Sequence, residues 1–158
     1  MKKNINMLKA GVLGAGHLGK IHLRLLQESE KFELVGFFDP FTENAEKVAK
    51  EFGYKLFDSI EELIAAVEVV DIVTPTLSHF ECAKKAIEKG RHIFIEKPIT
   101  KTVLEAEAIK TLASQFHVQG QVGHVERFNP AFTAVKDKID APMFIETHRL
   151  AEFNPRGT

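Results

Sequence analysis

Three glycines in an early apolar stretch of the chain have the spacing of a phosphate-binding turn. Gly14, Gly16 and Gly19 form the pattern G-x-G-x-x-G. In this pattern the first glycine permits a tight turn, the second lets a pyrophosphate approach the backbone, and the third allows a helix to pack closely on a strand. A helix that follows the turn would direct its free main-chain amides at the phosphates. The sequence therefore predicts a dinucleotide-binding turn with these contact residues: Gly14, Ala15, Gly16, His17, Leu18 and Gly19.

An acidic residue stands where such a turn needs a partner for a ribose. Asp39 ends the second apolar run, 20 positions after Gly19. A carboxylate there would accept hydrogen bonds from the ribose hydroxyls and would repel a 2′-phosphate, which predicts NAD in preference to NADP. In the alternative interpretation, the glycines only form a tight turn and the Asp39 side chain only caps a turn. The combination of strand, turn, helix and acid favours the dinucleotide site over that alternative.

The same residues also resemble the start of a P-loop. Residues 14–20 match G-x-x-x-x-G-K. A P-loop then needs Ser or Thr to hold magnesium, and Ile21 stands at that position. A P-loop also gives Asp39 no role. The sequence therefore favours a dinucleotide site over a nucleotide triphosphatase.

The elements that must position these residues alternate along the chain. Short apolar runs typical of strands buried on both faces are separated by amphipathic helical stretches, one with Leu18, Ile21 and Leu25 on a single face. Capping-box patterns mark three helix starts, and Gly53 and Gly90 mark two helix ends. The alternation predicts an α/β fold, a Rossmann-type doubly wound parallel sheet. The expected strands are Leu8–Leu13, Phe32–Phe38, Val69–Val73, His92–Ile95 and Val118–Val122; the capping boxes are Ser59–Glu62, Ser78–Glu81 and Thr102–Glu105.

The pattern changes after residue 124. Asn129-Pro130 predicts a helix to about Ile139, and Met143–Leu150 then predicts a strand. We expect residues 1–124 to form an NAD(P)-binding Rossmann domain. Residues 125–158 would be a connecting helix and the first strand of a second α/β domain that is otherwise absent. An exposed strand of this kind would also allow pairing between chains.

Length and composition limit the remaining function classes. The 158 residues suit one ordinary domain, and the formal net charge of −1 gives no basic excess for nucleic acid or an anionic membrane surface. No apolar run approaches the roughly 20 residues of a membrane span. The histidines lack metal-ligand spacing, and the single Cys82 excludes a cysteine zinc site and fits a reducing cytoplasm. These features predict a cytoplasmic protein with no metal site and with no nucleic-acid or membrane partner.

Further candidates follow the third, fourth and fifth expected strands. Ligands of doubly wound sheets bind beyond the carboxyl ends of the strands, where Thr74-Pro75-Thr76, Glu96-Lys97-Pro98 and Arg127 would lie. Lys97 at a strand end can hydrogen-bond a substrate hydroxyl and stabilise a developing alkoxide. Spacing alone fits a solvated surface lysine better. Arg127 can neutralise the charge of a ligand or form a surface ion pair.

Taken in order, the motifs G-A-G-H-L-G, Asp39, T-P-T-x-x-H and E-K-P resemble the Gfo/Idh/MocA oxidoreductases over essentially the whole chain. Members of that family use a nicotinamide cofactor to oxidise or reduce sugars and cyclitols. The resemblance implies that Lys97 lies beside the nicotinamide and substrate and is catalytic. It also implies cofactor contacts for Thr74, Pro75, His79 and Glu96. The segments G-H-V-E-R-F-N-P and H-R-L-A-E-F-N-P-R-G are similar to those of members acting on nucleotide-linked amino sugars at C3.

One departure from the family pattern shapes the functional expectation. Family members carry a second α/β domain with a D-x-x-x-H motif whose histidine is the acid/base, and through which they usually form homo-oligomers. This chain contains no such motif. We therefore expect an N-terminal part of an NAD-dependent sugar, nucleotide-sugar or cyclitol dehydrogenase that binds cofactor and is inactive alone. The alternative is a non-catalytic NAD-binding sensor or regulatory module.

Overall fold

The chain divides into two compact units. The computed structural model describes residues 7–148 and 150. One unit runs up to His124 and the other begins at Val125.

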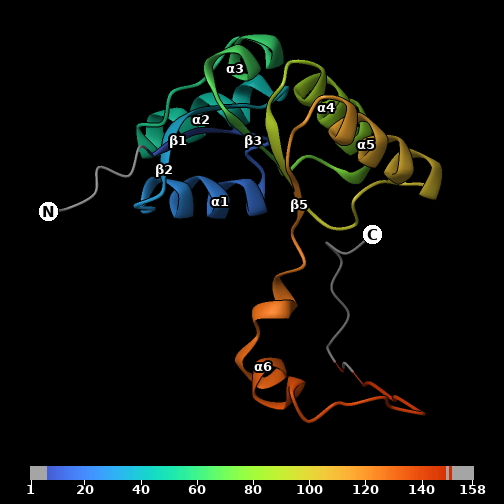
Figure 1. Cartoon of the computed structure of the whole chain (residues 1–158). Coiled ribbons are helices and arrows are strands. Elements are labelled where there is room, and N and C mark those ends of the chain that lie inside the picture. Colours follow the sequence, from blue (N-terminus) through green and yellow to red (C-terminus); the bar gives the residue numbers. More distant parts are fainter. Residues whose placement is uncertain (1–6, 149, 151–158) are drawn as a thin grey trace, which may run out of the picture. The chain divides into compact units, whose positions relative to one another are not determined.

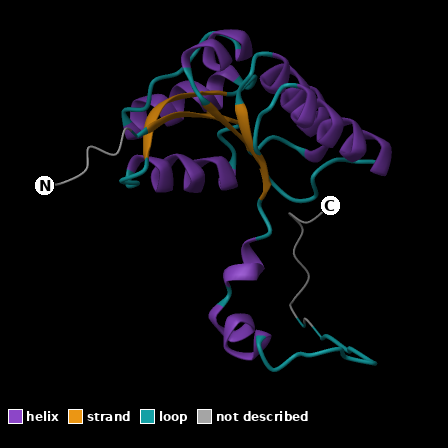
Figure 2. Cartoon of the chain, viewed as in Figure 1, coloured by secondary structure: helices purple, strands orange, loops and turns teal. Residues whose placement is uncertain are grey.

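The first unit is built on a five-stranded parallel sheet (Figures 1 and 2). The strand order is β2-β1-β3-β4-β5, which confirms the predicted doubly wound α/β fold. Leu56 adds an isolated parallel bridge to Phe37 of β2. The strands are β1 (Leu8–Leu13), β2 (Phe32–Phe38), β3 (Val69–Ile72), β4 (His92–Ile95) and β5 (Gly120–Val122).

Five helices cover the two faces of the sheet. Leu23 of α1 and Val48 of α2 pack with Val12 and Phe37 on one face. On the other face α3 packs against β1 and β2, α4 packs against β3 and β4, and α5 packs beside α4. Burying both faces explains the nearly continuous apolar strands. No described helix is long and apolar enough to cross a membrane. The helices are α1 (His17–Gln27), α2 (Thr42–Phe52), α3 (Ile60–Ala66), α4 (Thr76–Glu88) and α5 (Val103–Gln115).

Local capping chemistry accounts for the starts of α3 and α5 and for the end of α2. Ser59 accepts a hydrogen bond from the Glu62 amide at the start of α3, and Thr102 forms a full capping box with Glu105 at the start of α5. Gly53 ends α2 in a left-handed conformation. The predicted cap at Ser78 is wrong: it lies within α4, which has Pro75 as its N-cap. The fixed φ of proline suits a helix entrance, so α4 starts earlier than the hydroxyl pattern indicated.

The predicted apolar face of α1 is also wrong. Leu18 and Leu25 are exposed, whereas Gly19 and Leu23 are the buried residues of this helix. The reason is steric. A Cβ atom at Gly19 would collide with the Gly14 carbonyl oxygen, so the glycine side of α1 is the side that lies against the turn after β1. Close packing at one glycine therefore outweighs the leucine pattern in orienting the helix.

The second unit is short where it is described. A 3-10 turn, η1 (Val125–Phe128), precedes α6 (Pro130–Lys136), which confirms the predicted helix start. Asn129 caps α6 by accepting a hydrogen bond from the Ala131 amide. The predicted strand Met143–Leu150 is wrong: residues 143–148 and 150 are not in a strand, and residue 149 lies outside the described residues. Strands need a partner for their main-chain groups, and no strand occurs among the described residues of this unit. Residues 151–158 of the predicted second part also lie outside the described residues.

Gly19→Ala tests the close packing of α1. We expect the free energy of unfolding to fall by about 1–3 kcal/mol, because overpacking against a backbone carbonyl outweighs the gain in helix propensity of roughly 0.5–1 kcal/mol. Gly16→Ala is the matched control, since no described atom lies within 4 Å of a Cβ atom built at Gly16. Denaturant unfolding curves provide the measurement. Equal unfolding midpoints for Gly19→Ala and the wild type would contradict the close packing of α1 against the Gly14 carbonyl.

Candidate functional site

The candidate residues of the first unit gather at one edge of its sheet. The glycine turn follows β1, Asp39 follows β2, Thr74 follows β3, and Lys97 follows β4. All four strands are parallel, so these segments meet at the carboxyl edge. The order β2-β1-β3 also makes β1 the point where the chain changes direction across the sheet. Ligands of open α/β sheets bind at such a switch point.

The glycine turn has the shape that a phosphate group needs. Gly14 has a φ of +98°, and a Cβ atom there would lie 2.8 Å from the Val73 carbonyl oxygen. At Gly16 the corresponding space is open, with no described atom within 4 Å of a Cβ atom. Among the described residues no side chain caps α1, and its first turn contains no acidic residue. The free amides and the positive end of the helix dipole therefore remain available to an anion.

Asp39 connects the end of β2 to this turn. Its buried carboxylate accepts a hydrogen bond from the Ala15 amide at 2.7 Å and another from the Phe41 amide at 2.9 Å. The Asn44 side chain of α2 donates a hydrogen bond to the Ala15 carbonyl at 3.2 Å. The amide and the carbonyl of Ala15 are therefore both held by side chains. Sequence reasoning missed Asn44, because no pattern marks a polar residue in an amphipathic helix as a turn ligand.

These contacts leave Asp39 able to bind a further ligand. An ionised carboxylate offers about four lone-pair sites, and the two backbone amides occupy one on each oxygen. The remaining sites can accept hydrogen bonds from ribose hydroxyls. Together with the open space at Gly16 and the uncapped α1, this makes the carboxyl edge of β1 and β2 fit a dinucleotide.

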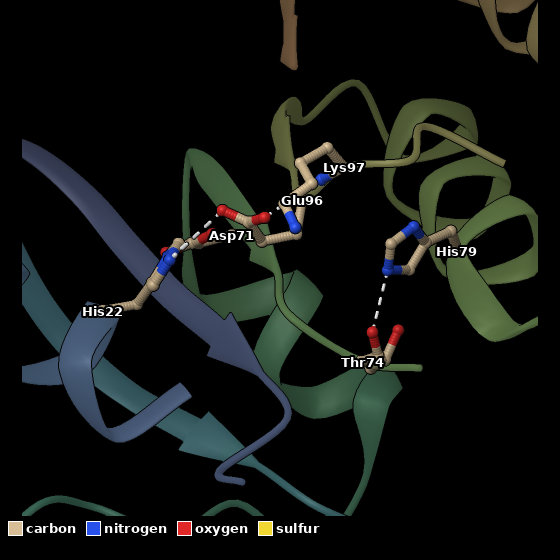
Figure 3. Close-up of polar contacts among 6 residues, drawn as sticks. All are labelled: His22, Asp71, Thr74, His79, Glu96 and Lys97. Atoms are coloured by element: carbon tan, nitrogen blue, oxygen red, sulfur yellow. Dashed lines mark hydrogen bonds and ion pairs between the residues drawn. The ribbon is translucent and has the colours of Figure 1, made fainter. Parts of the chain in front are cut away.

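His79 lies inside the protein, between two loops of the site. Its side chain is buried, with Nε2 at 2.8 Å from the Thr74 carbonyl oxygen (Figure 3). Its Nδ1 atom lies 2.9 Å from the Pro98 carbonyl oxygen. Carbonyl oxygens only accept hydrogen bonds, so the ring nitrogen that carries a proton is the donor. The imidazole thereby links the loop after β3 to the loop after β4. Its predicted contact with the cofactor stays a prediction.

The loop after β4 exposes Lys97 and buries its neighbour. Glu96 is buried, and its Oε2 atom accepts a hydrogen bond from the Lys97 amide at 3.0 Å. The Lys97 side chain is exposed at the carboxyl edge, and the Lys97–Pro98 peptide bond is cis. An ammonium group at this edge is able to donate hydrogen bonds to a ligand oxygen.

Two ionisable residues next to this loop were not predicted as site residues. His22 of α1 and Asp71 of β3 form an ion pair of 2.8 Å beneath the carboxyl edge. A carboxylate inside an otherwise apolar buried strand was the available signal for Asp71, since such a group needs a partner. His22 carries no comparable signal, because a polar residue in an amphipathic helix is ordinary.

The other predicted contacts are placed as follows. His17 and Leu18 are exposed in the first turn of α1, Thr76 begins α4, and Pro75 is its N-cap. Arg127 is exposed in η1, in the second unit. The roles of these residues stay predictions. Cys82 is buried, and burial raises the pKa of its thiol while the Thr74 hydroxyl opposes that rise, which suits a packing role.

Comparison with known proteins identifies the family. Residues 8–124 match the oxidoreductase family with an NAD-binding Rossmann fold, GFO_IDH_MocA. The chain belongs to this family. The match covers every strand of the sheet and every motif of its carboxyl edge up to His124, so the expected resemblance is confirmed.

Individual relatives include sugar and cyclitol dehydrogenases. The chain is 39% identical over 151 residues to UDP-N-acetylglucosamine 3-dehydrogenase of Acidithiobacillus ferrooxidans, covering 95% of this chain and 48% of that protein. It is 38% identical over 140 residues to scyllo-inositol 2-dehydrogenase (NAD(+)) of Bacillus subtilis, covering 86% of this chain and 41% of that protein. A solved structure of the A. ferrooxidans enzyme superposes with a TM-score of 0.79 at 37% identity, over 84% of this chain and 43% of that one. The chain thus spans about half the length, or less, of these relatives.

His79→Ala tests the link between the two loops. We expect the free energy of unfolding to fall by about 2–5 kcal/mol, because the change opens a cavity and removes the hydrogen-bonding imidazole between the Thr74 and Pro98 carbonyl groups. Ser78→Ala is the control on the same helix, since Ser78 is exposed and does not cap α4. Thermal or denaturant unfolding measures both. A loss no larger than that of the Ser78 variant would show that His79 does not hold these loops.

Proposed function

We propose that this chain is the cofactor-binding part of an NAD-dependent dehydrogenase that acts on a sugar, nucleotide-sugar or cyclitol hydroxyl. The observation that carries the proposal is the geometry of the glycine turn and Asp39: an open approach at Gly16, an uncapped α1, and a carboxylate with free acceptor sites. The names of the sugar and inositol dehydrogenases among the relatives support the substrate class.

Asp39 supports NAD over NADP. Its carboxylate is buried and fixed by the Ala15 and Phe41 amides, so it is not free to turn away from an added phosphate. A 2′-phosphate would bring negative charge against this fixed carboxylate, and like charges at such close range repel each other. The ribose hydroxyls of NAD, by contrast, are donors that match its remaining acceptor sites.

Lys97 is the residue that we propose touches the substrate. When bound, the nicotinamide supplies the acceptor or donor of the hydride. The exposed Lys97 ammonium donates a hydrogen bond to the substrate oxygen and stabilises the negative charge that develops there. Its main chain is anchored by Glu96, and the adjoining Pro98 carbonyl by His79. The lysine thus extends from a loop held by two buried side chains.

A second proposal concerns the parent protein. The described residues up to His124 form the cofactor-binding domain, and we propose that residues 125–158 lead into a second domain that supplies the acid/base histidine of the family pattern. The lengths of the relatives, about twice that of this chain or more, support this division. A homo-oligomeric parent enzyme and a cytoplasmic location stay predictions.

Asp39→Ala tests the cofactor preference. We expect wild-type chain to bind NADH more tightly than NADPH, and the variant to lose roughly tenfold to a hundredfold in NADH affinity, which corresponds to a charge-assisted hydrogen bond of about 1.5–3 kcal/mol. NADPH affinity should fall less or rise, because the repelling charge is gone. Titration by cofactor fluorescence measures both, and Asp58→Ala removes an exposed carboxylate as the control. Equal losses for the two cofactors would contradict the role of Asp39.

Gly16→Ala separates cofactor binding from folding. We expect the variant to keep its stability to within about 0.5 kcal/mol, since the added methyl group meets no described atom. The same methyl group would occupy the path of the pyrophosphate, so NADH affinity should fall by about tenfold or more. Calorimetric unfolding and NADH titration of one preparation give both values. Unchanged NADH affinity in a folded variant would place the pyrophosphate elsewhere.

A further inference from the structure

Three ionisable side chains from three separate elements meet beneath the carboxyl edge of the sheet. The Nδ1 atom of His22 on α1 lies 2.8 Å from Oδ2 of Asp71 in β3, and its Nε2 atom lies 3.5 Å from Oε1 of Glu96, which follows β4 (Figure 3). Asp71 is 5% exposed and Glu96 is 8% exposed. Solvent therefore screens this cluster of His22, Asp71 and Glu96 only weakly.

The surroundings of the cluster leave it few other partners. The Phe94 ring packs edge-on against the His22 imidazole at a centroid distance of 5.9 Å. A Cβ atom at Gly123 would lie 2.7 Å from Oε1 of Glu96, so the chain after β5 closes tightly over this carboxylate. Oδ1 of Asp71 is buried without a hydrogen-bond partner among the described residues. Among the described residues, the imidazole is thus the recorded side-chain partner of Asp71 and of Oε1 of Glu96, while Oε2 of Glu96 accepts from the Lys97 amide.

The protonation of His22 decides whether both carboxylates are satisfied. An imidazolium carries a proton on each ring nitrogen, which matches one acceptor on each side, whereas a neutral ring donates to only one of them. Asp71 and Glu96 are the charged groups recorded as facing His22 among the described residues; Phe94 from β4 is apolar, and Gly123 after β5 has no side chain. Loss of the His22 proton must therefore weaken the contact with Asp71 or that with Glu96.

Glu96 connects this cluster to the proposed catalytic loop. While Oε1 faces His22, Oε2 accepts the hydrogen bond from the Lys97 amide at 3.0 Å. One rigid carboxylate thus spans the distance from α1 to the backbone of Lys97. We propose that His22, Asp71 and Glu96 form a positioning cluster, in which the proton on His22 fixes the Glu96 carboxylate and thereby the backbone of Lys97. The role of Lys97 at the substrate, which gives this positioning its purpose, rests on the proposed function.

The direction of the pH dependence follows from the contacts. Burial opposes the charged form of His22, but the hydrogen bond to Asp71 and the charges of Asp71 and Glu96 outweigh it and raise the pKa of His22. For Asp71, burial opposes the charged carboxylate and so raises its pKa, while the hydrogen bond and charge of His22 act in the opposite direction. A raised pKa in the folded state means that the stabilisation is complete below the pKa of the unfolded chain. It is lost as pH rises through the folded pKa. The cluster therefore holds Lys97 below the folded-state pKa of His22 and releases it as the pH rises through that pKa.

Nuclear magnetic resonance of the isotope-labelled chain, without cofactor, tests this coupling. We expect the Lys97 amide signal to shift with the same midpoint as the His22 ring signals, and that midpoint to lie above the ordinary pKa of a histidine. The amides of Ser114 and Gln115, exposed near the end of α5, serve as controls and should not follow this titration. A Lys97 amide that stays constant while His22 titrates would overturn the proposal, and this measurement needs no variant.

Glu96→Gln tests the route of the coupling. The variant keeps the size of the side chain but removes its charge, so His22 should titrate at a lower pH than in the wild type and the Lys97 amide should no longer follow it. A Lys97 amide that still follows His22 in this variant would overturn the part assigned to Glu96. Because no cofactor is present, these outcomes are independent of NADH titration: failure to bind NADH would count against the proposed function alone.

Discussion

The close approach of α1 to the turn after β1 is the constraint on which the site depends. At Gly19 the helix lies so near the Gly14 carbonyl that any side chain would collide with the backbone. This contact places the N-terminus of α1 at the carboxyl end of β1, and it turns Leu18 and Leu25 outward. The same contact leaves the first-turn amides of the helix facing the space beside Gly16. An anion site thus results from a packing requirement between a helix and a strand.

Two buried carboxylates extend this arrangement to both sides of β1. Asp39 after β2 holds the Ala15 amide, and Glu96 after β4 holds the Lys97 amide. In each case an acidic side chain fixes a main-chain amide at the carboxyl edge, Asp39 in a neighbouring loop and Glu96 in its own loop. Hydrogen bonds to ionised acceptors are shorter and stronger than neutral ones, so such anchors give rigid loops at the edge where a ligand would bind. Preorganised groups of this kind need little rearrangement when charge develops on a substrate.

The sequence predicted the sheet because local and global signals agree there. Apolar β-branched runs, a glycine turn and helix caps are short-range features, and they located the five strands to within two residues at their ends. The Ser78 cap and the strand at Met143–Leu150 were wrong because each pattern competes with context: proline set the start of α4, and strands require a partner. The cluster of His22, Asp71 and Glu96 could not be predicted. Its members are far apart in the sequence, and only the packing of α1 on the sheet brings them together.

We propose that the glycine turn and Asp39 bind the cofactor. The most direct test is to add NADH to the labelled chain and map which backbone amide signals change. The structure predicts the largest changes at residues 14–19 and around Asp39 and Phe41, with smaller changes in the loops after β3 and β4. Changes confined to the outer surface of α5, or no change at saturating NADH in a folded chain, would contradict it.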